Sequence, residues 1–276
     1  MNRPHFLCLM PVWNHRHETI QNALRCFLDQ TYPNATLAII DDRPKTARTA
    51  ILASDWNNWG RRVHLVRPHE SGKFPSISAK YNFALESMGS MLGFTHVAIW
   101  DDDDGFTEGH LEAAAWEYER VKEGSVLWTY PDKVFSTFGG FLNVEPTEGR
   151  FWSSITFDRK CLDPWGGLFP DRKNVGQDQM FLGELKTRFA DSRATPTLPT
   201  YVYRWGREGE QHWSGISQGF NCESSWDACP YSVSGKPLEA VYDEFYLQTR
   251  QEIEAYYRKH ISPTTPPPPR LTASVD

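Results

Sequence analysis

Four consecutive aspartates, Asp101–Asp104, form the segment of this sequence with the clearest chemical potential. They directly follow the apolar run THVAIW (residues 95–100), so they close a segment that we expect to be buried. In an extended segment the side chains at i and i+2 point the same way, which places Asp101 and Asp103 on one side. Carboxylate oxygens in this arrangement suit Mn²⁺ or Mg²⁺, with phosphate oxygens filling the other coordination positions. One acid, Asp104, could instead cap the following helix, but four in a row exceed what capping needs.

Two other polar segments follow apolar runs in the same way. The first run ends in Pro11-Val12-Trp13-Asn14, and the second ends in Asp41-Asp42. Ligands of parallel α/β sheets bind at the carboxyl ends of the strands, so we expect these segments and the four aspartates to converge on one edge. Two acidic groups facing one crevice repel each other unless a cation lies between them. The spacing therefore predicts a site for a cation and an anionic ligand.

The elements that would position these side chains alternate along the chain. Strands are expected where the sequence is apolar over short runs, and helices where apolar residues recur with helical spacing. The expected strands are 5–12, 36–41, 62–67 and 95–100, and the expected helices between and after them are 16–31, 76–92 and 108–123. This alternation predicts an α/β fold with a mainly parallel sheet covered on both faces.

The pattern loosens after residue 124. Further strands are expected at 125–130, 152–157 and 200–204, and further helices at 177–190 and 236–259. We therefore expect residues 1–124 to form a ligand-binding α/β half and residues 125–261 to form a mixed, loop-rich half of the same domain. The Pro-rich segment 262–276 is expected to be a disordered tail.

Composition excludes some classes of function. The net charge of −6 argues against nucleic-acid binding through bulk charge, although the near-balanced charge of residues 150–210 allows a local groove. We find no apolar run long enough for a membrane span or a signal peptide. The five cysteines contain no CxxC pair, and a bridge between Cys222 and Cys229 is left open. We expect a cytoplasmic protein with reduced thiols and no stable membrane insertion.

Four stretches resemble a known family in their order and content. FLCLMPVWNHRHETIQNALRCFLDQTYPNATLAIIDDRP (6–44) is similar to the opening of family 2 glycosyltransferases of the GT-A fold. SISAKYNFALES (76–87) resembles the family's basic helix, and HVAIWDDDDGFTEGHLE (96–112) resembles its metal motif. WGGLFPDRKNVGQDQMFLGEL (165–185) resembles its acceptor-side stretch. The resemblance covers about residues 5 to 190 and implies transfer of a sugar from a nucleotide-sugar, although it does not identify the acceptor.

The resemblance assigns donor-binding roles residue by residue. Pro11, Val12 and Trp13 would line the nucleotide base, and Asp42 would accept a hydrogen bond from that base, which the family suggests is uracil. Lys80 would lie beside the pyrophosphate or ribose of a UDP-sugar.

The resemblance also assigns a divalent metal, Mn²⁺ or Mg²⁺. Asp101 and Asp103 would hold it together with the donor diphosphate, and Asp102 would belong to the donor-binding residues. His212 would complete the metal shell and Arg204 would hold phosphate, in a Gly-rich segment that we expect to order over the bound donor.

The resemblance further implies an inverting displacement with Asp178 as general base. The alternative for Asp178 is a cap of the helix that begins there, and the two roles are compatible. Trp165, Gly166 and Gly167 would bind the acceptor, with core packing as the alternative for Trp165.

The acceptor and the class of reaction leave alternatives. The acceptor could be a glycan, a lipid-linked or small molecule, or a hydroxymethylated base in DNA. From another class, the chain could be a nucleotidyltransferase or a non-catalytic module that binds nucleotide-sugars. A nucleotidyltransferase is disfavoured because Pro-Val-Trp-Asn-His follows the first strand in place of a Gly-rich basic loop, and a dead module is disfavoured because the aspartates are present in full.

Overall fold

The structure is a computed structural model and describes most of the first three quarters of the chain. The described residues are 3–12, 17–42, 62–68, 74–120, 125–136, 143–147, 151–170, 177–196, 198–203, 251, 255 and 258. Several predicted features lie outside them: Trp13, Arg204, His212, Cys222, Cys229 and the tail 262–276. The helix predicted at 236–259 is described at three positions only, which are helical and exposed.

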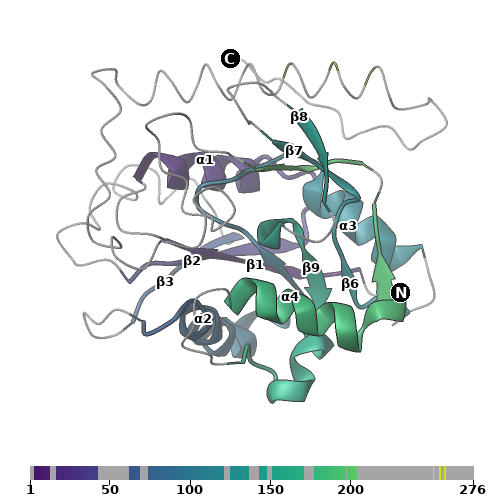
Figure 1. The fold of residues 1–276 in the computed structure, drawn as a ribbon. Helices are drawn as coiled ribbons and strands as arrows, with labels where there is room; N and C mark the ends of the chain where they lie inside the picture. The colour runs from purple at the N-terminus through teal and green to yellow at the C-terminus, as the bar shows by residue number, and fades with distance from the viewer. Residues whose placement is uncertain are drawn as a thin grey trace, which may run out of the picture.

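A seven-stranded sheet forms the centre, in the order β10-β6-β9-β4-β1-β2-β3 (Figure 1). Its parallel part comprises β1 (Phe6–Pro11), β2 (Ala35–Ile40), β3 (Val63–Val66) and β4 (His96–Ile99). Every residue of β1, β2 and β4 is buried, because helices cover both faces of a parallel sheet. The four predicted strands and the α/β fold class are confirmed.

The second part of the chain extends the same sheet. Strand β9 (Thr156–Asp158) pairs antiparallel with β4, and β6 (Trp128–Thr129) pairs antiparallel with β9. Strand β10 (Arg193–Ala194) then adds to β6 in parallel. Residues before and after position 124 therefore share one sheet.

A smaller sheet has the order β5-β11-β7-β8. It consists of β5 (Gly105–Phe106), β11 (Tyr201–Tyr203), β7 (Lys133–Ser136) and β8 (Asn143–Pro146). Strand β5 comes directly after the four aspartates and pairs antiparallel with β11. The two strands lie close because position 105 is a glycine: a Cβ there would lie 3.1 Å from the Cβ of Val202.

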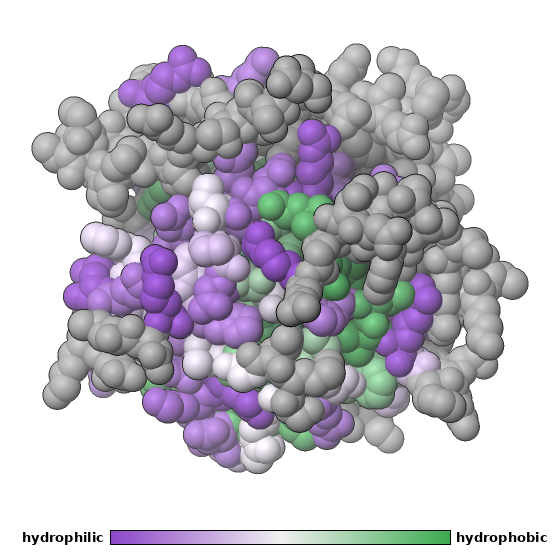
Figure 2. Space-filling view, turned by 180° about the vertical axis from the view of Figure 1, so that it is seen from behind, coloured by the Kyte–Doolittle hydropathy of each residue, from purple (hydrophilic) through white to green (hydrophobic). Residues whose placement is uncertain are grey.

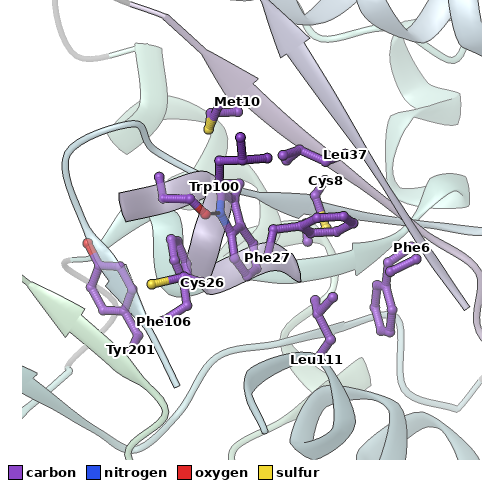
Figure 3. Packing of buried hydrophobic residues seen from close by; sticks show 14 of the residues in the cluster. Phe6, Cys8, Met10, Cys26, Phe27, Leu37, Trp100, Phe106, Leu111 and Tyr201 are labelled. Carbon is purple, nitrogen blue, oxygen red and sulfur yellow. Dashed lines mark hydrogen bonds between the residues drawn. The ribbon is translucent and has the colours of Figure 1, made fainter. Parts of the chain in front are cut away.

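Helices cover the large sheet on both faces (Figure 1). Helices α1 (His17–Leu28) and α3 (His110–Glu119) pack on one face with the even-numbered residues of β1, such as Phe6 and Cys8. Helices α2 (Ile77–Leu92) and α4 (Gln177–Arg188) pack on the other face with Leu7 and Leu9. Figure 3 shows the first of these two cores, with Trp100 between Phe27 and Phe106. The alternation of side chains along β1 thus builds two cores from one strand.

One local prediction was wrong, and one alternative from the sequence does not hold. The run 152–157 is not one strand, because Trp152–Ser154 form a 3₁₀ turn, η5, before β9 begins. Asp104 does not cap α3, because β5 lies between the aspartates and the helix, whose N-cap is Gly109 without a side-chain bond. Two further 3₁₀ helices, η6 (Arg159–Trp165) and η7 (Ala190–Ser192), flank α4 in the sequence.

The described surface carries few large hydrophobic side chains. The exposed ones are Leu28, Trp116 and Met180. Figure 2 shows hydrophilic residues over much of the rear face, with one group of hydrophobic residues right of its centre. Among the described helices, none combines the length and the apolar character that crossing a bilayer demands.

The side chain of Gln30 joins the end of α1 to the start of α3. Its Nε2 donates to the carbonyl oxygens of Cys26 and Thr107 at 2.9 and 2.6 Å, and its Oε1 accepts from the Leu111 backbone N–H at 3.0 Å. Gln30 is buried, so these backbone groups have little access to water in its absence.

We expect Gln30→Met to lower the free energy of unfolding by about 2–3 kcal/mol, because it keeps the volume but removes three hydrogen bonds to buried backbone groups. Urea unfolding measures the loss. The exposed Gln21 on α1 supplies the control, Gln21→Met, which should change stability by less than about 0.5 kcal/mol. Equal stability of the two variants would show that the Gln30 side-chain bonds do not stabilise the fold.

Candidate functional site

The four aspartates lie in a turn whose two ends are held together by aromatic rings. Trp100 precedes the turn and Phe106 follows it, and their rings stack with centroids 3.7 Å apart at 13°. The Trp100 indole also donates to the Ala23 carbonyl oxygen in α1 at 2.9 Å. The stack closes the turn against the core and fixes where its side chains emerge.

Three of the four carboxylates converge. One oxygen from each of Asp101, Asp103 and Asp104 lies within 4.8 Å of the others, a spacing that a single divalent cation can bridge. The structure thus brings together the two predicted ligands, Asp101 and Asp103. It adds Asp104, for which the sequence also allowed a place at a helix cap. Asp102 is buried beside them but is not one of the three.

Burial and mutual repulsion shape the electrostatics of this turn. Burial raises the pKa of Asp101 well above its usual value, and the charges of Asp103 and Asp104 raise it further. The Ser153 hydroxyl donates to Asp101 Oδ2 and opposes that rise. On the other side of the turn, the Tyr201 hydroxyl donates to Asp104 Oδ2. Neither Ser153 nor Tyr201 was identified from the sequence, because nothing in a lone Ser or Tyr reveals what it contacts.

A buried ion pair lies at the end of β2. Lys80 Nζ is 2.9 Å from Asp42 Oδ1 and donates to the Val12 carbonyl oxygen at 3.0 Å. The other oxygen of Asp42 accepts from the Phe74 backbone N–H at 3.1 Å. Both side chains are less than 9% exposed. Among the predicted donor residues, Lys80 therefore contacts both Val12 and Asp42, and its ammonium faces Asp42 rather than open solvent.

The predicted base, Asp178, belongs to the first turn of α4. Burial raises the pKa of the Tyr81 phenol well above its usual value, and the charges of Asp101, Asp178 and Asp102 add to that effect. The Tyr81 hydroxyl accepts a bond from the Trp152 indole at 3.3 Å. The Tyr81 phenol is thus influenced by the charges of the acidic turn and of Asp178 alike.

The predicted acceptor residues lie at the end of η6. The Trp165 ring packs 5.6 Å from the Phe181 ring of α4, and the Arg188 guanidinium lies 5.4 Å from its centroid. The packing that the sequence left as an alternative for Trp165 is thus present. Gly166 and Gly167 both have positive φ angles, 73° and 85°, which favour glycine at these positions.

Asn82 fixes the loop that follows these glycines. Its Nδ2 donates to the Phe169 carbonyl oxygen at 2.9 Å, and its Oδ1 accepts from the Phe169 N–H at 2.7 Å. The Phe169 ring packs between Tyr81 and Phe181, at 5.0 Å from each ring centroid. Helix α2 is therefore hydrogen-bonded directly to the loop that follows Gly166 and Gly167.

The sequence profile described as Glycosyl transferase family 2 matches residues 8–178, more than half of the chain. No curated protein sequence matches the chain.

Among solved structures, S. aureus TarS 1-349 in complex with UDP has a TM-score of 0.56 and 15% identity over 73% of this chain. The same protein in complex with UDP-GlcNAc has a TM-score of 0.53 and 17% identity over 74% of this chain. The chain spans 60% and 59% of those two TarS chains. This likeness confirms the GT-A type of fold.

Asp101→Asn should stabilise the protein in chelator at neutral pH. The pKa of Asp101 is higher in the folded protein than in the unfolded chain, so this carboxyl costs stability as the pH rises from the unfolded-state pKa toward the folded-state pKa. The asparagine oxygen can still accept from Ser153, and we expect a gain on the order of 1 kcal/mol.

Thermal unfolding in EDTA measures this gain. It should be largest near about pH 8 and shrink as the pH falls toward about 4, where the wild-type carboxyl is protonated in both states. The exposed Asp132→Asn is the control. A destabilised Asp101→Asn protein at about pH 8 would show that burial does not dominate at this site.

Proposed function

Because the chain belongs to glycosyl transferase family 2, we propose that it moves a sugar from a nucleoside-diphosphate sugar onto an acceptor hydroxyl. The observation that carries the proposal is the convergence of Asp101, Asp103 and Asp104 at the carboxyl end of β4. The predicted donor residues Val12 and Asp42 lie at the carboxyl ends of β1, which pairs with β4, and of β2, the next strand beyond β1 in the same sheet. A nucleotide and a diphosphate fit side by side along this edge.

The acidic turn fits a divalent cation, Mn²⁺ or Mg²⁺. Its donors are all hard oxygens, and the crowded carboxylates repel one another unless a cation compensates their charge. Asp101, Asp103 and Asp104 would hold the ion, and His212 remains a predicted further ligand. When bound, the ion would supply Lewis-acid stabilisation of the negative charge on the departing diphosphate.

The ion pair at the end of β2 would recognise the base. Asp42 is held from two sides, by Lys80 and by the Phe74 backbone, so its carboxylate orientation is set before a ligand arrives. A carboxylate acceptor suits the N–H of a uracil ring, and we propose a UDP-sugar as donor. Pro11 and Val12, which are buried in this edge, would form the floor under the base together with Trp13.

Asp178 would take the proton of the acceptor hydroxyl. The acceptor oxygen forms its bond to the anomeric carbon as the bond from that carbon to the diphosphate oxygen breaks, which inverts the configuration. Asp178 accepts the hydroxyl proton in the same step. The glycine-shaped turn at Gly166 and Gly167, with Trp165, would present the acceptor on the side of α4.

The acceptor we propose is a glycan or a small molecule. A hydroxymethylated DNA base keeps its place as an alternative acceptor for the same chemistry. Retention of a modified duplex in a gel shift at low salt would favour DNA, because phosphate contacts strengthen as the salt concentration falls.

Donor hydrolysis tests the proposed function without knowledge of the acceptor. With a panel of nucleotide-sugars and Mn²⁺, we expect slow release of the nucleoside diphosphate from one donor, measured by chromatography. Asp103→Asn should slow it by at least about 100-fold, since Lewis-acid stabilisation contributes several kcal/mol. The exposed Asp191→Asn serves as the control. Full turnover in chelator by a folded Asp103→Asn protein would refute the metal-dependent transfer.

Asp178→Asn tests the base separately. The variant should bind the nucleotide-sugar as tightly as wild type, because Asp178 lies on the acceptor side. Its hydrolysis rate should fall by about 10²–10⁴-fold, since a positioned base contributes that much. Calorimetry reports donor binding, and the exposed Asp163→Asn is the matched control. An unchanged rate would remove Asp178 from the mechanism.

A further inference from the structure

Two hydroxyl groups reach the acidic turn from segments that do not carry the acids. Ser153, in η5, donates to Asp101 Oδ2, and Tyr201, in β11, donates to Asp104 Oδ2. Both side chains are 1% exposed. The two outer acids of the three that converge are therefore each held by a buried hydroxyl from a distant part of the chain.

The position of Tyr201 is set by its strand and its ring rather than by the acid. Strand β11 pairs with β5 so that Tyr201 lies opposite Phe106. The rings of these two residues are 5.5 Å apart, and the Phe151 ring is 6.2 Å from that of Tyr201. In Figure 3 the Tyr201 hydroxyl points away from the apolar cluster that holds its ring. Packing thus delivers the hydroxyl to a fixed place beside Asp104.

The position of Ser153 is fixed in the same way by its neighbours. The preceding Trp152 donates to the Tyr81 hydroxyl and packs its ring 5.7 Å from that of Phe181. After Ser153, the backbone N–H groups of Ser154 and Ile155 donate to the carbonyl oxygens of Phe151 and Trp152, each at 3.2 Å. The turn that carries Ser153 is consequently anchored on both sides, independently of Asp101.

Hydroxyl donors of this kind determine how a carboxylate presents its oxygens. A bond to Oδ2 restricts rotation of the carboxylate and leaves Oδ1 available to a cation. Without these bonds, repulsion among three acids favours rotamers that separate their oxygens. The two hydroxyls therefore oppose the repulsion that would otherwise move the three carboxylates apart.

We propose that Ser153 and Tyr201 are positioning residues that hold Asp101 and Asp104 ready for a divalent cation and so set the affinity of the site. The inference rests on the proposed function, which places the cation at this turn. It goes further in making cation affinity depend on η5 and β11, which lie about 50 and 100 residues after the turn in the sequence.

Titration of the full chain with Mn²⁺ alone, without nucleotide-sugar, tests the proposal. Free Mn²⁺ is read by electron paramagnetic resonance, so the readout is binding and not turnover. We expect Ser153→Ala and Tyr201→Phe each to weaken Mn²⁺ binding by about 10- to 100-fold, the usual effect of losing a group that orients a metal ligand.

Matched controls separate this role from loss of a buried hydroxyl in general. Ser154→Ala removes the hydroxyl of the adjacent buried serine. Tyr118→Phe removes a buried phenol that bonds to Thr156 at 3.0 Å, away from the acids. Both controls should bind Mn²⁺ as wild type does, and thermal unfolding without Mn²⁺ checks that all four variants are folded.

The outcomes distinguish this inference from the proposed function. If Asp103→Asn abolishes Mn²⁺ binding while Ser153→Ala and Tyr201→Phe bind normally, the positioning role is refuted and the cation site stands. If the wild type neither binds Mn²⁺ nor hydrolyses any donor, both are refuted. Should Tyr201→Phe fail to fold, Ser153→Ala measured against Ser154→Ala decides the matter.

Discussion

Repulsion among the carboxylates that follow β4 is the constraint on which the rest of this structure depends. Three acids whose oxygens lie within 4.8 Å of one another separate unless the chain holds them there. The Trp100–Phe106 stack closes the ends of their turn, and the hydroxyls of Ser153 and Tyr201 hold two of the acids. Much of the second part of the chain can be understood as the structure that keeps these charges together.

Contacts of the turn η5 also join the acidic turn to helices α2 and α4. The turn η5 contacts the acids through Ser153 and reaches α2 and α4 through Trp152. Asn82 of α2 bonds the backbone of the loop after Gly166 and Gly167 at two points. Strand β9 places this second half of the chain in the same sheet as the first. Helices α2 and α4, the turn η5 and the loop after Gly166 and Gly167 thus contribute to one packed core.

The strands that are buried on both faces could be predicted from the sequence. Strands β1, β2 and β4 are apolar throughout because both faces are covered, so their runs were visible without partners. Strand β5 has two residues and exists because β11 pairs with it, so local sequence contains no signal for it. The aspartate run identified the acidic turn, but contacts across a hundred residues, such as Tyr201 with Asp104, depend on the tertiary fold. The alternative that Asp104 caps a helix fails for the same reason, since the strand β5 between the aspartates and α3 was not foreseen.

The close approach of Gly105 to Val202 restricts which residues position 105 can accept, and it does so through the strand that holds the acidic turn. A methyl group at position 105 would push on the strand that carries Tyr201, one residue away from the contact. In a saturation mutagenesis scan, substitutions of Gly105 would then reduce function as substitutions of the acids do, although Gly105 carries no charge and binds no ligand. A small residue directly after the aspartates is therefore required by the spacing of a strand pair rather than by backbone freedom. Replacing Gly105 by a larger residue would shift the neighbouring acids without a direct contact to them.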